Sequence, residues 1–236
     1  MLGLERRTCE SSCFNRLSAL IIRNECRPWP FVPGGLVAYR SHHPQRERGG
    51  AKRMRRKKRI ALIGGGPTAV YTLKNLLQKS DELEITLFEA GRIAGCGIPY
   101  SPEHNTPDMM ANITSVEIPP VLVSLADWVR SADARFLKTF GIERDQVGER
   151  DYYPRILIGA YYIDQLERMV ASSAPWHKVV IETETRVLDI KPLGKSFEIM
   201  VRKGSDNASR RFDAVVMATG HLSEPNRPAT PVQVES

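Results

Sequence analysis

The stretch that decides the fold is IALIGGGPTAVYTLKNLL, residues 60–77. Its first four residues form a short apolar run, which predicts a buried parallel strand. Three glycines follow the run. From Pro67 to Lys79 the apolar residues recur at helical spacing, which predicts a helix. The segment Leu83 to Glu89 (LEITLFE) predicts a second strand, so the whole reads as a β-α-β unit with parallel strands.

The turn between the first strand and the helix fits the pattern G-x-G-x-x-A. Gly64 allows a tight turn, Gly66 lets a pyrophosphate approach the backbone, and Ala69 lets helix and strand pack closely. Pro67 suits the first helical turn, where its missing N–H would be unpaired anyway. The free N–H groups and the positive helix end then face the phosphates of a nucleotide. The predicted phosphate cradle comprises Gly64, Gly65, Gly66, Pro67, Thr68 and Ala69.

Glu89 ends the second predicted strand, 25 residues after Gly64. At this spacing a carboxylate accepts hydrogen bonds from the ribose hydroxyls, and its charge repels a 2′-phosphate. The motif therefore predicts FAD or NAD at this site rather than NADP. The alternative is a structural glycine turn in an unrelated α/β protein, with Glu89 as a solvated acid at the end of a strand.

The basic charge of the chain lies at its start. The 236 residues hold 34 Lys and Arg against 27 Asp and Glu, but the run AKRMRRKKR at 51–59 alone holds seven basic residues and no acidic one. The rest from residue 60 onward is mildly acidic, which predicts no nucleic-acid partner. Apolar runs are short, which predicts no membrane span. Four cysteines in this length exclude a disulfide scaffold.

Residues 1–58 show no sustained helical or strand period, and we interpret them as a disordered or loosely ordered basic extension. The apolar stretch near Ala19 is too short for a secretory signal, and four glutamates in this region argue against a transit peptide. We therefore expect a cytoplasmic location. The basic run is either a solvated lead-in to the first strand or a nuclear signal or anionic-surface patch.

Downstream of the β-α-β unit, we interpret Gly91 to Pro120 as an irregular insertion rich in Gly, Pro and Asn. An irregular segment of this length inside a compact domain is usually functional. The segments 182–190 and 196–202 predict a hairpin or meander with its turn near Gly194. The segment 214–218 predicts a late strand that ends at Thr219-Gly220. The fold class is thus α/β, a Rossmann-like parallel sheet with helices on its faces and a small antiparallel meander.

These blocks together resemble the two-dinucleotide-binding flavoproteins. More narrowly, GIPYSP, ANITSVEIP and YPR, with VVMATGH, resemble the FAD/NAD(P)-binding domain shared by FAD-dependent urate hydroxylases and aspartate N-monooxygenases. The resemblance covers about residues 58–222, and we delimit the domain as 59–222 with a Pro-rich tail at 223–236. It implies FAD as cofactor, NAD(P)H as electron donor and a small-molecule substrate.

The resemblance also implies roles for particular residues. The A-T-G backbone would close over the FAD, Val187 would present its backbone to the adenine, and a third group would lie near the flavin ring. The A-T-G residues are Ala218, Thr219 and Gly220, and the flavin group comprises Gly97, Ile98, Pro99, Tyr100 and Asn112.

Three further side chains have two interpretations each. Cys96 lies in the expected flavin loop without a nearby second cysteine, so we expect a small space-filling residue rather than a redox disulfide. His221 is a structural histidine or an acid/base group. Arg155 either holds a phosphate or an acidic substrate or forms a surface ion pair. The sequence identifies no catalytic residue and no metal-binding pattern.

The chain ends sixteen residues after Gly220 with no second G-x-G motif, so we expect a domain truncated at its C-terminus relative to the flavin monooxygenases. Either it is a fragment, or a second chain completes the active site, or it binds flavin without turnover. Three functions stay open: a flavin-dependent, monooxygenase-like oxidoreductase, a non-catalytic FAD- or NAD-binding module, and an anionic-surface or nucleic-acid binder acting through residues 51–59.

Overall fold

The computed structural model describes residues 57–220. The extension at 1–58, apart from its last two residues, lies outside this range. His221, the tail at 223–236 and most of the basic run at 51–59 lie outside it as well.

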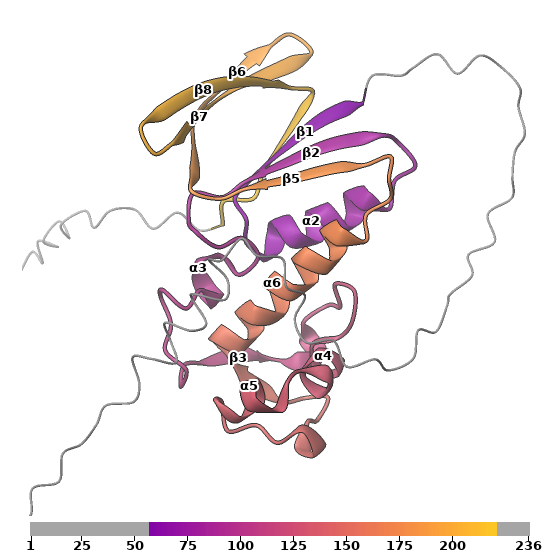
Figure 1. Ribbon diagram of the computed structural model, residues 1–236, viewed down its shortest axis with the longest axis vertical. Helices are drawn as coiled ribbons and strands as arrows, with labels where there is room; N and C mark the ends of the chain where they lie inside the picture. The colour runs from indigo at the N-terminus through magenta and orange to yellow at the C-terminus, as the bar shows by residue number, and fades with distance from the viewer. Residues whose placement is uncertain (1–56, 221–236) are drawn as a thin grey trace, which may run out of the picture. The chain divides into compact units, whose positions relative to one another are not determined.

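The centre of the domain is a sheet of four parallel strands in the order β5-β2-β1-β9 (Figure 1). The strands are β1 (Lys58–Ile63), β2 (Leu83–Phe88), β5 (Lys178–Glu182) and β9 (Ala214–Met217). β1 and β2 are nearly all buried because the sheet is covered on both faces. The strands expected at 60–63, 83–89 and 214–218 are confirmed.

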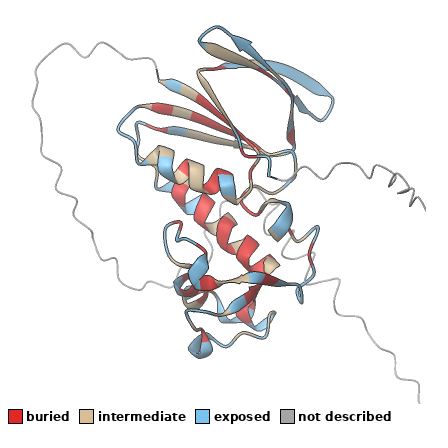
Figure 2. Cartoon of the chain, turned by 180° about the vertical axis from the view of Figure 1, so that it is seen from behind, coloured by how far each residue is buried: buried red, intermediate tan, exposed pale blue. Residues whose placement is uncertain are grey.

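Alternate residues of β1 belong to two different cores, as the two-residue period of a strand requires. Ile60 and Leu62 pack with the helices, whereas Ala61 and Ile63 pack with the meander. The helical layer contains α2 (Pro67–Leu77) and the 17-residue α6 (Arg155–Ala171), which lie together on one side of the sheet in Figure 1. Figure 2 shows buried residues along β1, β2 and α6. Between residues 57 and 220, no helix has both the length and the apolar character needed to cross a membrane.

The opposite side of the sheet carries an antiparallel meander of β6 (Thr185–Leu193), β7 (Ser196–Lys203) and β8 (Asp206–Phe212). The expected pairing of 182–190 with 196–202 is confirmed, except that Glu182 belongs to β5 in the central sheet. The chain turns between the two sheets at Glu184, whose φ is 54°. The Thr185 N–H then donates to the carbonyl oxygen of Glu89 at 2.9 Å, so β6 begins beside the end of β2.

The expectation that 91–120 is wholly irregular is wrong. The segment contains the short helix α3 (Gly97–Tyr100), the strand β3 (Met110–Thr114) and the 3-10 turn η1 (Ser115–Glu117). β3 pairs with β4 (Tyr152–Pro154), some forty residues further along the chain, which no local pattern reveals. Between them lie α4 (Leu125–Ser131), α5 (Ala134–Lys138) and η2 (Arg144–Gln146).

Helix α6 fixes the insertion to the helical layer by close backbone contact. A Cβ atom added at Gly159 would lie 2.2 Å from the carbonyl oxygen of Tyr100 and 3.2 Å from Cβ of Cys96. The insertion also contacts Ile163, which lies one turn after Gly159 on α6. A Cβ added at Gly95 would lie 2.9 Å from Cα of Ile163. The absence of side chains at Gly95 and Gly159 therefore sets how closely the insertion approaches α6.

We predict that Gly159→Ala lowers the free energy of unfolding of the full chain by about 2 kcal/mol, because the added methyl group clashes with a backbone oxygen. Helix propensity alone favours alanine by about 1 kcal/mol, so the predicted sign is opposite to that of an exposed site. Urea denaturation measures the change. The control is Ala160→Gly, which should cost the propensity term and the packing of one half-buried methyl group. A Gly159→Ala protein more stable than the wild type would contradict the contact.

Candidate functional site: the glycine turn after the first strand

Gly64 leaves β1 with φ of 99°, a backbone conformation that favours glycine. A Cβ atom there would lie 2.4 Å from the carbonyl oxygen of Ala218 and 3.0 Å from Cα of Thr219. The Ala218 N–H donates to the carbonyl oxygen of Ile63 at 2.7 Å. The structure thus brings the glycine turn and the A-T-G segment together, and the tight turn expected at Gly64 is observed.

The Glu89 carboxylate is bonded by two backbone N–H groups. Gly65 donates to Oε2 at 2.7 Å, and Gly91 donates to Oε1 at 2.6 Å. A Cβ atom on Gly65 would lie 2.8 Å from the same Oε2 atom, so a side chain there would displace the carboxylate from this position. Glu89 is half-buried and stays in place at the end of β2, close to the glycine turn. The alternative considered from the sequence, a glutamate at a strand end that is simply solvated, would not be held by two backbone N–H donors.

The first turn of α2 has N–H groups without acceptors. Gly66 is the N-cap, in extended conformation and without a side-chain cap, and Pro67 has no N–H to offer. Among the hydrogen bonds of residues 57–220, none is donated by the N–H of Gly66 or of Thr68. Ala69 is fully buried, as close packing of helix and strand requires. These unpaired donors, at the positive end of an eleven-residue helix, suit a phosphate group.

The start of α3 lies against the glycine turn. A Cβ atom on Gly66 would be 3.4 Å from Cα of Gly97, whose φ is 60°. Beyond Gly97, Ile98 and Pro99 are exposed and Tyr100 is half-buried. These four predicted site residues thus extend from the glycine turn through an exposed segment and return to α6 at Tyr100.

Two predicted site residues lie on separate strands. Asn112 is exposed on β3, in the small sheet at the start of α6. Val187 is on β6, where it packs against the core between the sheets, two residues after the Thr185 N–H that bonds Glu89. Gly220 is exposed with φ of 68°.

Sequence reasoning missed Gly95 and Gly159. The Gly95 N–H donates to the carbonyl oxygen of Gly65 at 2.6 Å, with φ of 112° at Gly95. Gly95 therefore couples the glycine turn to the insertion. The signal was present as a glycine two residues before Gly97, whereas the role of Gly159 depends on a contact between distant segments.

Cys96 is buried, with 1% of its surface exposed, and packs beside Gly159. Burial raises the pKa of its thiol to about 11, since the thiolate cannot be solvated there. The interpretation of Cys96 as a small packing residue agrees with this environment.

A glycine turn between a parallel strand and a helix, with a fixed carboxylate at the end of the next strand, defines a nucleotide-binding α/β domain. The family model described as FAD-NAD(P)-binding matches residues 61–222. The chain belongs to this family and is an FAD/NAD(P)-binding domain.

The chain is similar to longer proteins. It is 37% identical over 174 residues to the uncharacterized protein YdhS of Escherichia coli, covering 73% of this chain and 32% of that protein. It is 26% identical over 178 residues to monooxygenase ptmN of Penicillium ochrochloron, covering 73% and 25%. The crystal structure of Tmm from Pelagibacter matches with a TM-score of 0.47 and 21% identity, covering 72% of this chain and 38% of that one. The chain thus spans about a third or less of its curated relatives.

We predict that Cys96 resists alkylation in the native protein. With a pKa of about 11, about one thiol in a thousand is ionised at pH 8, and the fraction rises roughly tenfold for each pH unit up to that value. Iodoacetamide labelling followed by peptide mass spectrometry measures this, with the urea-unfolded chain as control. Equal labelling rates in the native and unfolded chains would contradict the burial of the thiol.

Proposed function

We propose that the domain binds FAD across the glycine turn, with the diphosphate at the start of α2 and the adenosine ribose at Glu89. The support is the pair of unpaired N–H groups at Gly66 and Thr68, beside a carboxylate already oriented by Gly65 and Gly91. The proposed site contains Gly64, Gly65, Gly66, Pro67, Thr68, Ala69, Glu89, Gly97, Ile98, Pro99, Tyr100, Asn112, Val187, Ala218, Thr219 and Gly220.

The proposed activity is that of a flavin-dependent oxidoreductase of the monooxygenase kind, with NAD(P)H as electron donor. When bound, FAD would supply the hydride-transfer and oxygen chemistry that such a reaction needs. The protein's own residues would bind the cofactor and orient it. The backbone of the glycine turn would hold the diphosphate, Glu89 would accept hydrogen bonds from the ribose hydroxyls, and Gly97 to Tyr100 would border the ring. The similarity to monooxygenase ptmN supports this activity.

The narrower assignment, to the urate hydroxylase and aspartate N-monooxygenase group, rests on the GIPYSP, ANITSVEIP and YPR blocks. A cytoplasmic location and a small-molecule substrate belong to the same proposal. A second chain that completes the active site is part of the same proposal. The second candidate function is an FAD-binding module without turnover of its own.

We predict that Gly66→Glu abolishes FAD retention. The new side chain would extend toward Gly97, and its charge would oppose the diphosphate. The ratio of flavin absorbance to protein absorbance in the purified full chain measures retention. The control is Ser205→Glu, which adds the same charge on the exposed turn between β7 and β8. Unchanged FAD content in Gly66→Glu would contradict the proposed site.

Aerobic NADPH oxidation by the FAD-containing chain separates the two candidate functions. If the chain is an oxidoreductase, it should consume NADPH in air, and NADPH should bleach the flavin absorbance when oxygen is excluded. If the chain is only a binding module, it should retain FAD, and NADPH should leave the flavin absorbance unchanged.

A further inference from the structure

Arg155 starts α6 with a guanidinium group that has no acidic partner in the described chain. Its backbone N–H donates to the carbonyl oxygen of Met109 at 2.8 Å, and its Nε donates to that of Met110 at 3.4 Å. None of the ion pairs formed between residues 57 and 220 includes Arg155. The surface ion pair considered from the sequence is therefore not formed within this range.

The position of Arg155 on α6 relates it to the proposed flavin site. Residues 155, 159 and 163 are spaced four apart and share one helix face. On this face Ile163 contacts Gly95, which is bonded to the glycine turn, and Gly159 contacts Tyr100. Arg155 follows one turn further out, about 12 Å along the axis from Ile163. The face runs from the glycine turn, past the loop proposed to border the flavin, to the guanidinium.

The small sheet next to Arg155 exposes apolar side chains. Along β3 and β4, Ala111 and Tyr153 are buried, whereas Met110 and Tyr152 are 49% and 56% exposed. Asn112 is exposed as well, two residues after Met110 and thus on the same face of β3. Apolar surface next to an unpaired cation is suited to a molecule with both an apolar body and an anionic group.

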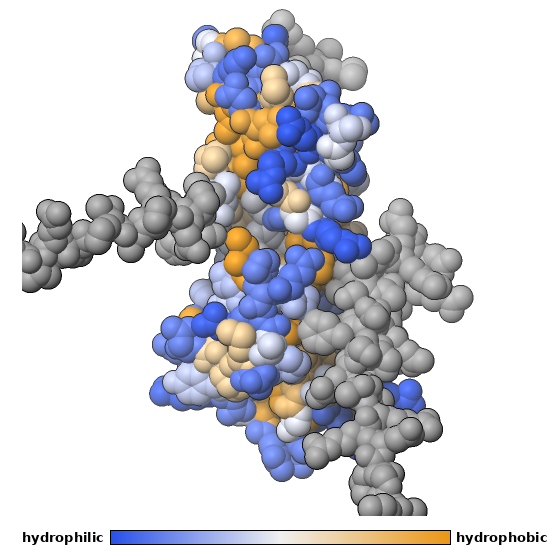
Figure 3. Space-filling model, turned by 90° about the vertical axis from the view of Figure 1, so that its left-hand side faces the viewer, coloured by the Kyte–Doolittle hydropathy of each residue, from blue (hydrophilic) through white to orange (hydrophobic). Residues whose placement is uncertain are grey.

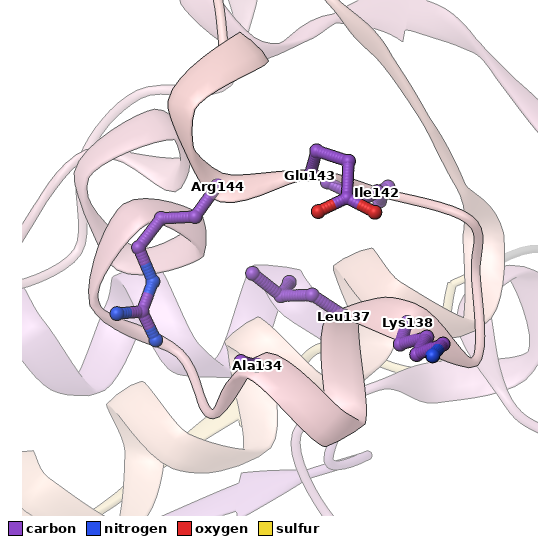
Figure 4. A pocket seen from close by; sticks show the side chains of 6 residues that line it. All are labelled: Ala134, Leu137, Lys138, Ile142, Glu143 and Arg144. Atoms are coloured by element: carbon purple, nitrogen blue, oxygen red, sulfur yellow. The ribbon is translucent and has the colours of Figure 1, made fainter.

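Other surfaces suit such a ligand less well. Figure 3 shows hydrophobic side chains reaching the surface in several separate places on one face of the molecule. A cavity of about 280 Å³ lies between α5 and residues 142–144 and contains Lys138 and Arg144 (Figure 4). Arg144 donates to the carbonyl oxygen of Ala132 at 2.6 Å, and Glu143 lines the same cavity. The positive charge there is already partly compensated.

We propose that Arg155, with the exposed face of Met110 and Tyr152, binds the carboxylate of an acidic substrate that has an aromatic or otherwise apolar body. The guanidinium offers parallel N–H donors that match the two oxygens of a carboxylate, and the side chains beside it contact the body. This assignment rests on the proposed function, since it places the substrate beside the flavin loop. The same chemistry would accept a phosphate of NADPH, which the test separates.

The test is calorimetric titration of the FAD-supplied full chain with benzoate, with benzamide as the uncharged probe of the same shape. Benzoate is expected to bind the wild type, and Arg155→Gln is expected to weaken that binding by about tenfold or more. Arg155→Lys should recover part of the affinity, since it restores the charge without the planar fork. Benzamide should bind the wild type and Arg155→Gln equally weakly.

The matched control is Arg168→Gln on the same helix, where the arginine pairs with Asp164; it should leave benzoate binding unchanged. Two results would overturn the assignment: benzoate binding no tighter than benzamide in the wild type, or Arg155→Gln weakening NADPH but not benzoate. FAD content, measured on the same samples, separates failure of the cofactor proposal from failure of this one. If the chain contains no FAD but Arg155→Gln still weakens benzoate binding, the anion site is supported and only the FAD proposal is rejected.

Discussion

The backbone at Gly64 and Gly65 is held from two sides, and the rest of the site depends on this. On one side the turn contacts the carbonyl of Ala218 at a distance that excludes any side chain on Gly64. On the other side Glu89 accepts a hydrogen bond from the N–H of Gly65, and a side chain on Gly65 would displace the carboxylate. With the turn fixed, the N–H groups of Gly66 and Thr68 at the start of α2 have no acceptor among the described residues. Free N–H groups at a helix start are suited to an anion, which is the basis of the proposed diphosphate site.

Further close backbone contacts, made at glycines, connect the turn with the insertion and with α6. Gly95 bonds the turn and packs on α6, and Gly159 of α6 packs on Tyr100. Each contact is short because no Cβ intervenes, so the insertion is held against the helix by backbone packing. One helix face thereby connects the glycine turn with Arg155, so the backbone position of Arg155 is tied to that of the turn.

The central β-α-β unit could be predicted because its signals are local. A buried strand, a glycine turn and a helix follow one another in sequence, and the next strand ends at Phe88, directly before Glu89. The antiparallel pairing of β6 with β7 is local in the same sense. The pairing of β3 with β4 is not local, and the interpretation of 91–120 as irregular failed for that reason. Glu182 was assigned to the wrong sheet because the chain passes between sheets within three residues, at Glu184.

The candidate site divides in the same way. Gly64, Gly66 and Glu89 follow from the chemistry of the motif, and the structure brings them together. The roles proposed for Asn112 and Val187 came from resemblance alone, since each lies on a strand whose place depends on tertiary contacts. Nothing in the sequence marks Gly159, because a glycine inside a helix is expected only to lower helix stability. Its role depends on the carbonyl oxygen of Tyr100, which packs against it in the folded chain.

The central claim is that exposed backbone amides at the start of α2 hold the diphosphate of an adenine dinucleotide. Titration of the ¹⁵N-labelled full chain with FAD, followed by amide NMR, tests it most directly. The account predicts that the amide resonances of Gly66 and Thr68 shift most, with those of Gly65 and Gly91 following as Glu89 engages the ribose. Unchanged resonances at Gly66 and Thr68 in protein saturated with FAD would contradict the account.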